Sequence, residues 1–153
     1  MIFIHIDDTL QLPETQLTIL AWLKEAAEET LRQTEVSQES ELSLVLSIDQ
    51  RLHELNREYL DIDAPTDVLS FPSDEIDPES SAPYLGDVII SYQRAVAQAK
   101  ASGHGLKDEL ALLTVHGVLH LLGYDHVEPD KKQAMWSVQA EVLQKLGTNV
   151  SPM

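Results

Sequence analysis

The chain has 153 residues, of which 43% are hydrophobic and 24% charged, a composition typical of a globular protein with one domain. Its formal net charge of −16 argues against a non-specific nucleic-acid binder, because the protein would repel phosphate at long range. The chain contains no cysteine, so disulfides and thiolate chemistry are excluded, and a transition metal would have to be bound by His, Asp or Glu.

Hydrophobic periodicity predicts four short strands and five helices. In chain order these are a strand at 2–6, a helix that starts near Pro13 and continues through Leu31, a strand at 42–47, a helix at 48–60, strands at 67–71 and 86–91, and helices at 92–102, 106–122 and 130–146. Residues 73–83 contain four acidic residues, three serines and two prolines without a basic residue, which predicts a loop. The strands are grouped among helices, so we expect one mixed α+β domain over residues 1–153, layered around one sheet.

No apolar run approaches the ~20 residues that a membrane-spanning helix requires. The first residues also lack the basic and then apolar pattern of a signal peptide. We therefore expect a cytoplasmic protein.

Three histidines occur in the segment HGVLHLLGYDH, residues 116–126. Helical positions i and i+4 lie on one face, so His116 and His120 can bind one ion. Gly123 can adopt a positive φ and end the helix, which lets His126 approach from a third direction. Three imidazoles leave a fourth tetrahedral position open, as in catalytic zinc sites. The pattern predicts one zinc ion per chain, although nickel, copper or iron would accept the same ligands.

The histidine spacing matches the metzincin protease signature HExxHxxGxxH, with one difference. Gly117 stands at the position of the glutamate that serves the proteases as general base. The pattern therefore predicts the metal but not peptidase activity.

Three acidic residues near these motifs have functional or structural interpretations. Asp125 precedes His126 and either orients a histidine, acts as a proton-transfer group, or simply forms a turn. Asp67 and Asp87 each precede an apolar run, and we expect a structural role at a strand end for both.

The remaining histidines and the tryptophans have ordinary interpretations. His5, His53 and His104 lack partners at ligand spacing, so we expect surface or packing roles. Trp22 and Trp136 follow helical patterns, which favours core packing over stacking on nucleic-acid bases.

The histidine motif, the pair Leu55-Asn56, the run PTDVLSFP at 65–72 and the triplet LGD at 85–87 together resemble the YbeY family of bacterial ribosomal-RNA maturation endoribonucleases. The resemblance extends over most of the chain from about residue 42. It implies a zinc-dependent endoribonuclease that acts on single-stranded RNA, in 3′-end maturation of small-subunit (16S) rRNA and in ribosome quality control. It assigns zinc to the same three histidines. The implied partners are single-stranded RNA, rRNA, and the small ribosomal subunit or its assembly factors, without DNA or a membrane.

One position departs from the family pattern. After the motif LNxxY the family typically places an arginine that faces the metal across the cleft, and here that position is Leu60. Arg57 lies three residues earlier on the same face of the predicted helix and is a candidate to replace it in part.

The expected chemistry is metal-assisted phosphodiester cleavage, with either water or the RNA 2′-hydroxyl as nucleophile. The alternative is a non-catalytic, zinc-containing assembly factor that binds an RNA end, which Leu60 and the acidic charge favour. The cleavage position, the oligomeric state and the protein partners do not follow from the residues.

Overall fold

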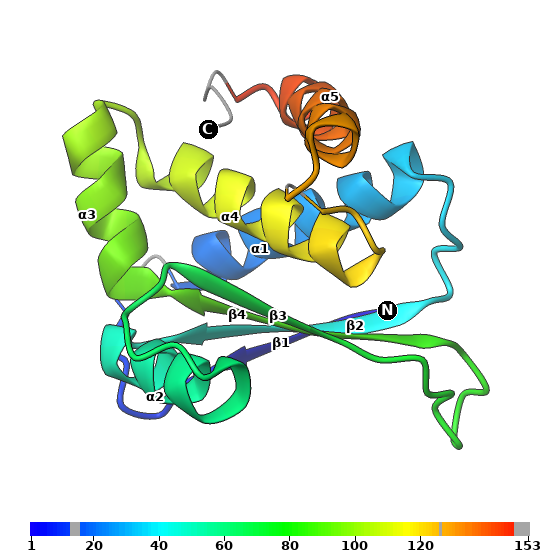
Figure 1. The fold of residues 1–153 in the computed structure, drawn as a ribbon, viewed down its shortest axis with the longest axis horizontal. Helices are drawn as coiled ribbons and strands as arrows, with labels where there is room; N and C mark the ends of the chain where they lie inside the picture. The colour runs from blue at the N-terminus through cyan, green and yellow to red at the C-terminus, as the bar shows by residue number, and fades with distance from the viewer. Residues whose placement is uncertain (13–15, 126, 149–153) are drawn as a thin grey trace.

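The computed structural model of the chain describes residues 1–12, 16–125 and 127–148. Two predicted features, the helix start at Pro13 and the third metal ligand His126, lie outside these residues. In chain order the elements are β1 (Ile2–Ile6), α1 (Gln16–Gln33), β2 (Glu41–Ser47), α2 (Asp49–Leu60), β3 (Val68–Pro72), β4 (Tyr84–Ser91), α3 (Tyr92–Ser102), α4 (Leu106–Leu121) and α5 (Pro129–Lys145) (Figure 1). The prediction of an α+β domain with one four-stranded sheet and five helices is confirmed for the described part of the chain.

The sheet has the strand order β1-β2-β4-β3. The first three of these strands are mutually parallel, and β3 pairs antiparallel with β4 at the edge. Side chains alternate between the two faces, as strand geometry requires. Leu44 and Val88 are fully buried on the face that α1 and α4 cover, whereas Val45 and Ile89 face α2.

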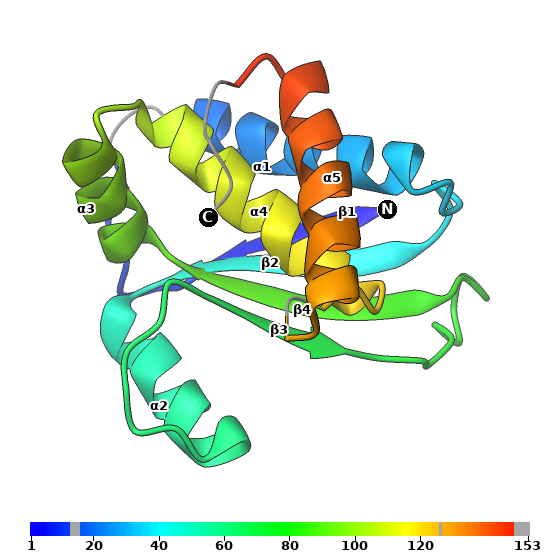
Figure 2. The same ribbon diagram turned by 45° about the horizontal axis from the view of Figure 1, so that its top comes forward.

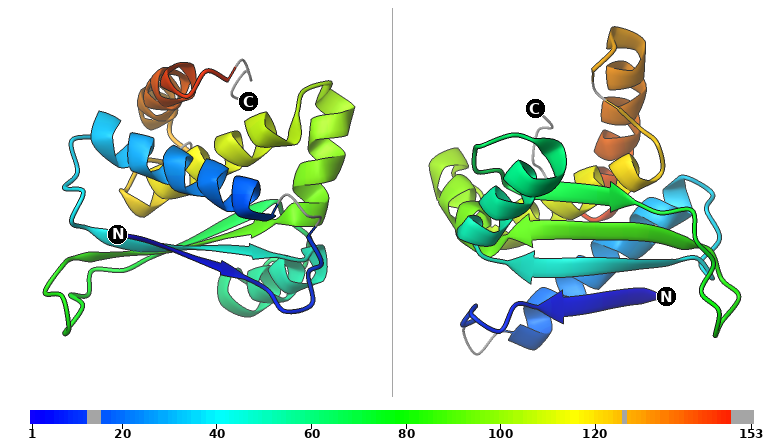
Figure 3. Two further views of the ribbon diagram at one scale, coloured as in Figure 1. Left: turned by 180° about the vertical axis from the view of Figure 1, so that it is seen from behind. Right: turned by 60° about the horizontal axis from the view of Figure 1, so that its bottom comes forward.

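Four helices, α1, α3, α4 and α5, lie on one side of the sheet, and α2 lies on the other (Figure 1). Figure 2 shows α4 between the sheet and α5, with α1 beside it. The two views in Figure 3 show that α2 covers only one end of the opposite face. Within the described residues, no helix is long and apolar enough to span a membrane.

Helix α4 is the centre of the fold, because it contacts α1, α3, α5, β3 and β4. Its residues Leu110 and Val118 are completely buried in the core formed with the sheet, and Val115 and Leu119 are completely buried in the core formed with α5. A helix that is apolar around its whole circumference is suited to such a central position. The side chains that α4 presents at its exposed margin are therefore held on a rigid support.

Candidate metal and RNA-cleavage site

Helix α4 ends as the sequence predicts, at a glycine in the left-handed region. Gly123 has φ +94°, and its N–H donates to the carbonyl of His120 at 3.1 Å. The N–H of Tyr124 donates to the carbonyl of Leu119 at 3.0 Å, which completes a Schellman motif. This ending turns the chain sharply just after the two helical histidines.

His116 and His120 lie side by side on α4. Their Nε2 atoms are 3.1 Å apart, and the two rings meet edge to face with centroids 4.7 Å apart. Two nitrogens bound to one tetrahedral zinc, at ~2.0–2.1 Å each, are separated by about 3.3 Å. The observed separation is close to this value, so the pair fits two ligands of one metal ion.

The third predicted ligand, His126, is not among the described residues. Within 1–12, 16–125 and 127–148, no group of three or more His, Asp or Glu side chains is arranged to hold a metal. The zinc site of three histidines therefore remains a prediction, supported by the geometry of its first two members.

Gln139 of α5 contacts the histidine pair from the neighbouring helix. Its Oε1 lies 3.0 Å from Nδ1 of His116, and the residue is only 1% exposed. The sequence analysis did not identify this residue. The sequence pattern that could have identified Gln139 is its place among the apolar positions of the helix. It follows Met135 by four residues and precedes Val142 by three, and both of those residues are fully buried.

A cleft of about 420 Å³ opens beside the histidine pair, between α4 and the edge strand β3. It is lined by Thr66, Asp67, Val68, Leu69, Ser70 and Pro72 together with His116 and His120. These six residues belong to the motif PTDVLSFP, which explains why that run accompanies the histidine motif. No Lys or Arg occurs among the described residues that line the cleft.

Asn56 positions the chain that leads into the cleft. It is 5% exposed, and its Nδ2 donates to the carbonyl of Ala64 at 3.0 Å, which fixes the loop between α2 and β3.

Gly86 lies in β4, the strand next to β3. It has φ +132°, and a Cβ there would lie 2.2 Å from the carbonyl oxygen of Phe71. Only glycine allows β4 to approach β3 this closely.

Gly117 faces the sheet and not the cleft. A Cβ on this residue would lie 2.5 Å from Cγ1 of Val88. Its carbonyl accepts a hydrogen bond of 2.8 Å from the hydroxyl of Ser70, which ties β3 to α4 between the two histidines. The glycine is therefore needed for close packing, and a glutamate at this position would collide with β4.

The structure places the acidic candidates in hydrogen bonds. Asp125 accepts from the N–H of Val127 at 3.1 Å through Oδ1, a turn arrangement. Asp67 lines the cleft and accepts from Nε2 of Gln98 at 3.1 Å. Asp87 lies within β4 and accepts from the hydroxyl of Tyr84, which contributes with burial to raising the pKa of Tyr84 to about 12.

Arg57 and Leu60 lie at the end of α2, and neither belongs to the residues that line the cleft. Both are exposed, Leu60 by 47%. In Figure 3 α2 lies on the face of the sheet opposite α4. A role of Arg57, Leu60 or Asp125 in catalysis stays a prediction.

Two of the other histidines and both tryptophans have local contacts. His53 and His104 each contact a carboxylate, Asp63 at 2.8 Å and Glu109 at 2.7 Å. Trp22 packs against the main core. Trp136 is half-buried, and Nζ of Lys132 lies 4.3 Å from its ring centroid.

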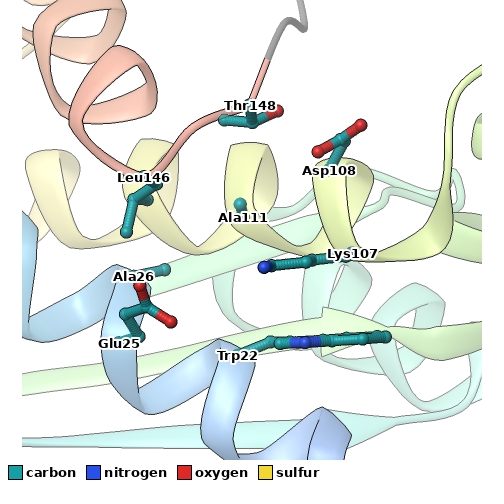
Figure 4. Close-up of a pocket in the computed structure, with 8 residues that line it drawn as sticks. All are labelled: Trp22, Glu25, Ala26, Lys107, Asp108, Ala111, Leu146 and Thr148. Atoms are coloured by element: carbon teal, nitrogen blue, oxygen red, sulfur yellow. The ribbon is translucent and has the colours of Figure 1, made fainter.

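Two further hollows occur in the described structure. A crevice of about 10 Å³ between α1 and α4, beside Trp22 and Lys107, has room for about one water molecule (Figure 4). A groove of about 790 Å³ lies on the open face of the sheet beside α2, and its margin includes Asp7, Asp8 and Asp87. Neither hollow contains the histidine pair.

The fold and the site define a class of protein. It is an α+β protein in which two imidazoles suited to a metal lie beside a cleft at the edge of the sheet. Comparison with known proteins identifies the family. Residues 5–147 match the family described as Endoribonuclease YbeY. The Endoribonuclease YbeY of Listeria monocytogenes serotype 4a (strain HCC23) is 40% identical over 153 residues, 93% of each chain. The chain belongs to the YbeY endoribonuclease family, and the prediction of an endoribonuclease, a hydrolase, is confirmed at this level.

Two other comparisons agree with this membership. The Endoribonuclease YbeY of Mycolicibacterium gilvum (strain PYR-GCK) is 44% identical over 122 residues, which cover 75% of this chain and 68% of the relative. The solution structure of TM1509 from Thermotoga maritima superposes with a TM-score of 0.63 at 26% identity. That match covers 95% of this chain and 89% of TM1509.

Proposed function

We propose that this chain is a zinc-dependent endoribonuclease that cleaves single-stranded RNA. We further propose that it acts in the cytoplasm, in 3′-end maturation of small-subunit (16S) rRNA and in ribosome quality control. Family membership supports the endoribonuclease activity. The observation that carries the metal dependence is the 3.1 Å separation of the Nε2 atoms of His116 and His120 beside the cleft.

In this proposal His116, His120 and His126 hold the zinc, and the cleft at β3 receives the RNA. When bound, zinc would supply positive charge that polarises the phosphodiester group. The hydrogen bond from Ser70 to the carbonyl of Gly117 keeps the cleft wall and the histidine helix in a fixed relation. The substrate is thereby presented to one end of α4.

The nucleophile is either water or the RNA 2′-hydroxyl. Gly117 supplies no base, and its Cβ direction is blocked by Val88. The 2′-hydroxyl route requires less from the protein, since RNA carries its own nucleophile. It also suits a single strand, whose backbone is free to align the 2′-hydroxyl with the scissile phosphate.

RNA binding is expected to be weak. The described lining of the cleft contains no basic residue, and the chain has only 10 Lys and Arg against 26 Asp and Glu. Few phosphates can therefore be neutralised directly, and the metal would provide much of the local positive charge.

Cleavage of an end-labelled single-stranded RNA by zinc-loaded protein tests this function, with His116→Ala as the inactive variant. His53→Ala is the matched control, because the side chain of His53 on α2 is only 40% exposed and pairs with Asp63, away from the histidine pair. We expect cleavage by wild type and His53→Ala but not by His116→Ala. Zinc-dependent binding of uncut RNA by pure wild-type protein would instead support the non-catalytic assembly factor.

A second substrate distinguishes the nucleophiles. An RNA with a single 2′-deoxynucleotide at the cleaved position would resist cleavage if the 2′-hydroxyl attacks, and the unmodified RNA would leave a 2′,3′-cyclic phosphate. Cleavage of both substrates at equal rates would assign the attack to water.

A further inference from the structure

Gln139 is a buried amide in an otherwise apolar contact between α5 and α4. It is 1% exposed, and its neighbours one turn away on α5, Met135 and Leu143, are 0% and 2% exposed. Burying an amide without a hydrogen-bond partner is unfavourable, so such a residue is normally bonded. The bond is the 3.0 Å contact between its Oε1 and Nδ1 of His116.

This contact determines which ring nitrogen of His116 carries the proton. An amide oxygen accepts hydrogen bonds but does not donate them, so Nδ1 of His116 must be the donor. In a neutral imidazole the lone pair then lies on Nε2. That atom is the one that faces Nε2 of His120 at 3.1 Å. The amide therefore holds His116 in the form in which it can bind a metal through Nε2.

The same reasoning makes His120 the hydrogen-bond donor to His116 in the metal-free protein. With the proton of a neutral His116 on Nδ1, its Nε2 can only accept, so a hydrogen bond across the 3.1 Å contact would be donated by Nε2 of His120. Metal binding replaces this hydrogen bond, since both nitrogens must then offer a lone pair.

Asp125, the sequence-based candidate for orienting a histidine, is less suited to this task. Its Oδ1 accepts the N–H of Val127, and it follows α4 in the turn. Gln139 reaches His116 from a separate helix across 23 residues of sequence, where packing fixes both partners.

We propose that Gln139 is a positioning residue of the metal site, which holds His116 in its Nδ1–H tautomer. This proposal extends the function proposed above, but the tautomer itself is a property of the metal-free protein. Partners of this kind typically change metal affinity by about 10–100-fold when they are removed. An anionic acceptor makes the imidazole a stronger ligand than a neutral one, so Gln139→Glu is expected to bind zinc at least as tightly as wild type.

The test begins with metal-free protein labelled with ¹⁵N in histidine, at about pH 9, where ordinary imidazoles are neutral. Long-range ¹H–¹⁵N spectra identify the protonated nitrogen of each ring. We expect Nδ1–H for His116 in wild type and in Gln139→Glu, and loss of this preference in Gln139→Met. Gln133→Met, at an exposed glutamine of the same helix, is the matched control and should resemble wild type.

Zinc dissociation constants, measured by competition with a chelator, give the second readout. We expect Gln139→Met to bind zinc about 10–100-fold more weakly than wild type, and Gln139→Glu to restore or exceed wild-type affinity. A Gln139→Met variant that keeps the Nδ1–H tautomer and wild-type affinity would overturn the proposal. If Gln139→Met does not fold, Gln139→Glu decides, and a ten-fold loss of zinc affinity in that variant would overturn it as well.

These readouts separate the proposal from the function on which it rests. Wild-type protein with the expected tautomer and zinc affinity, but without RNA cleavage, would refute the endoribonuclease function and leave the role of Gln139 intact. The reverse result, zinc-dependent cleavage with an Nε2–H tautomer at His116, would refute the role of Gln139 alone.

Discussion

Replacing Gly117 with alanine tests how closely α4 must approach the sheet. The new Cβ would lie 2.5 Å from Cγ1 of Val88 and 3.3 Å from Cγ2 of Val68. Relaxed carbon–carbon contacts are ~3.5–4.0 Å, so the overlap with Val88 is about 1 Å. Val88 is completely buried and β-branched, and its side chain cannot easily rotate away.

The expected cost follows from two opposing effects. Overpacking of a core by one methyl group costs ~1–3 kcal/mol, whereas alanine is favoured over glycine in a helix by ~1 kcal/mol. We expect the clash to dominate, because the neighbour is a fixed valine and not the end of a flexible chain. Gly117→Ala should lower the free energy of unfolding by about 1–2 kcal/mol.

Urea unfolding followed by circular dichroism measures this change, and Val88→Ala provides the control. In the double variant the clash is absent, so the Gly117→Ala substitution should cost less in the Val88→Ala background by at least about 1 kcal/mol. A Gly117→Ala variant that is as stable as wild type or more stable would show that helix propensity prevails. The close packing would then not explain the glycine.

Three further predictions concern the metal, the substrate and acid stability. Purified wild-type protein should contain about one zinc per chain and His120→Ala much less, and equal metal content by elemental analysis would contradict the ligand assignment. If Leu60 faces the RNA, Leu60→Arg should raise the rate of RNA cleavage by up to about 10²-fold with unchanged zinc content, and Arg57→Ala should lower that rate. Unchanged rates in both variants would show that neither side chain meets the substrate. Arg94 lowers the pKa of Asp49 from its ordinary value of 3.8, so their ion pair stabilises the fold above that pH and is lost as the pH falls through the lowered pKa. Asp49→Asn should therefore make stability less dependent on pH below about 4, by less than about 1 kcal/mol because the pair is partly exposed, and identical acid unfolding curves would contradict this.

The sequence predicted the elements because their hydrophobic patterns are local. The strand at 2–6 and the helix at 92–102 have the observed bounds. The strand predicted at 86–91 begins two residues earlier, at Tyr84, where β4 gains partners in β2. Such pairing depends on residues far away in the sequence, and the strand order β1-β2-β4-β3 could not be derived for the same reason.

The site was predictable where helical spacing alone determines geometry. The spacing of His116 and His120 and the positive φ at Gly123 follow from the residues themselves. The role of Gly117 could not be read in this way, because its neighbour Val88 belongs to another element. Gln139 was missed for a similar reason, since only the packing of α5 on α4 brings it to His116.

The central claim is that the histidine site holds one zinc ion on which RNA cleavage depends. Titration of metal-free protein with zinc, with the initial rate of single-stranded RNA cleavage measured at each step, tests it most directly. We predict that the rate rises in proportion to zinc and reaches a plateau at about one equivalent per chain, and that His120→Ala shows no such rise. Full cleavage by metal-free wild type, or a wild-type titration curve for His120→Ala, would contradict the claim.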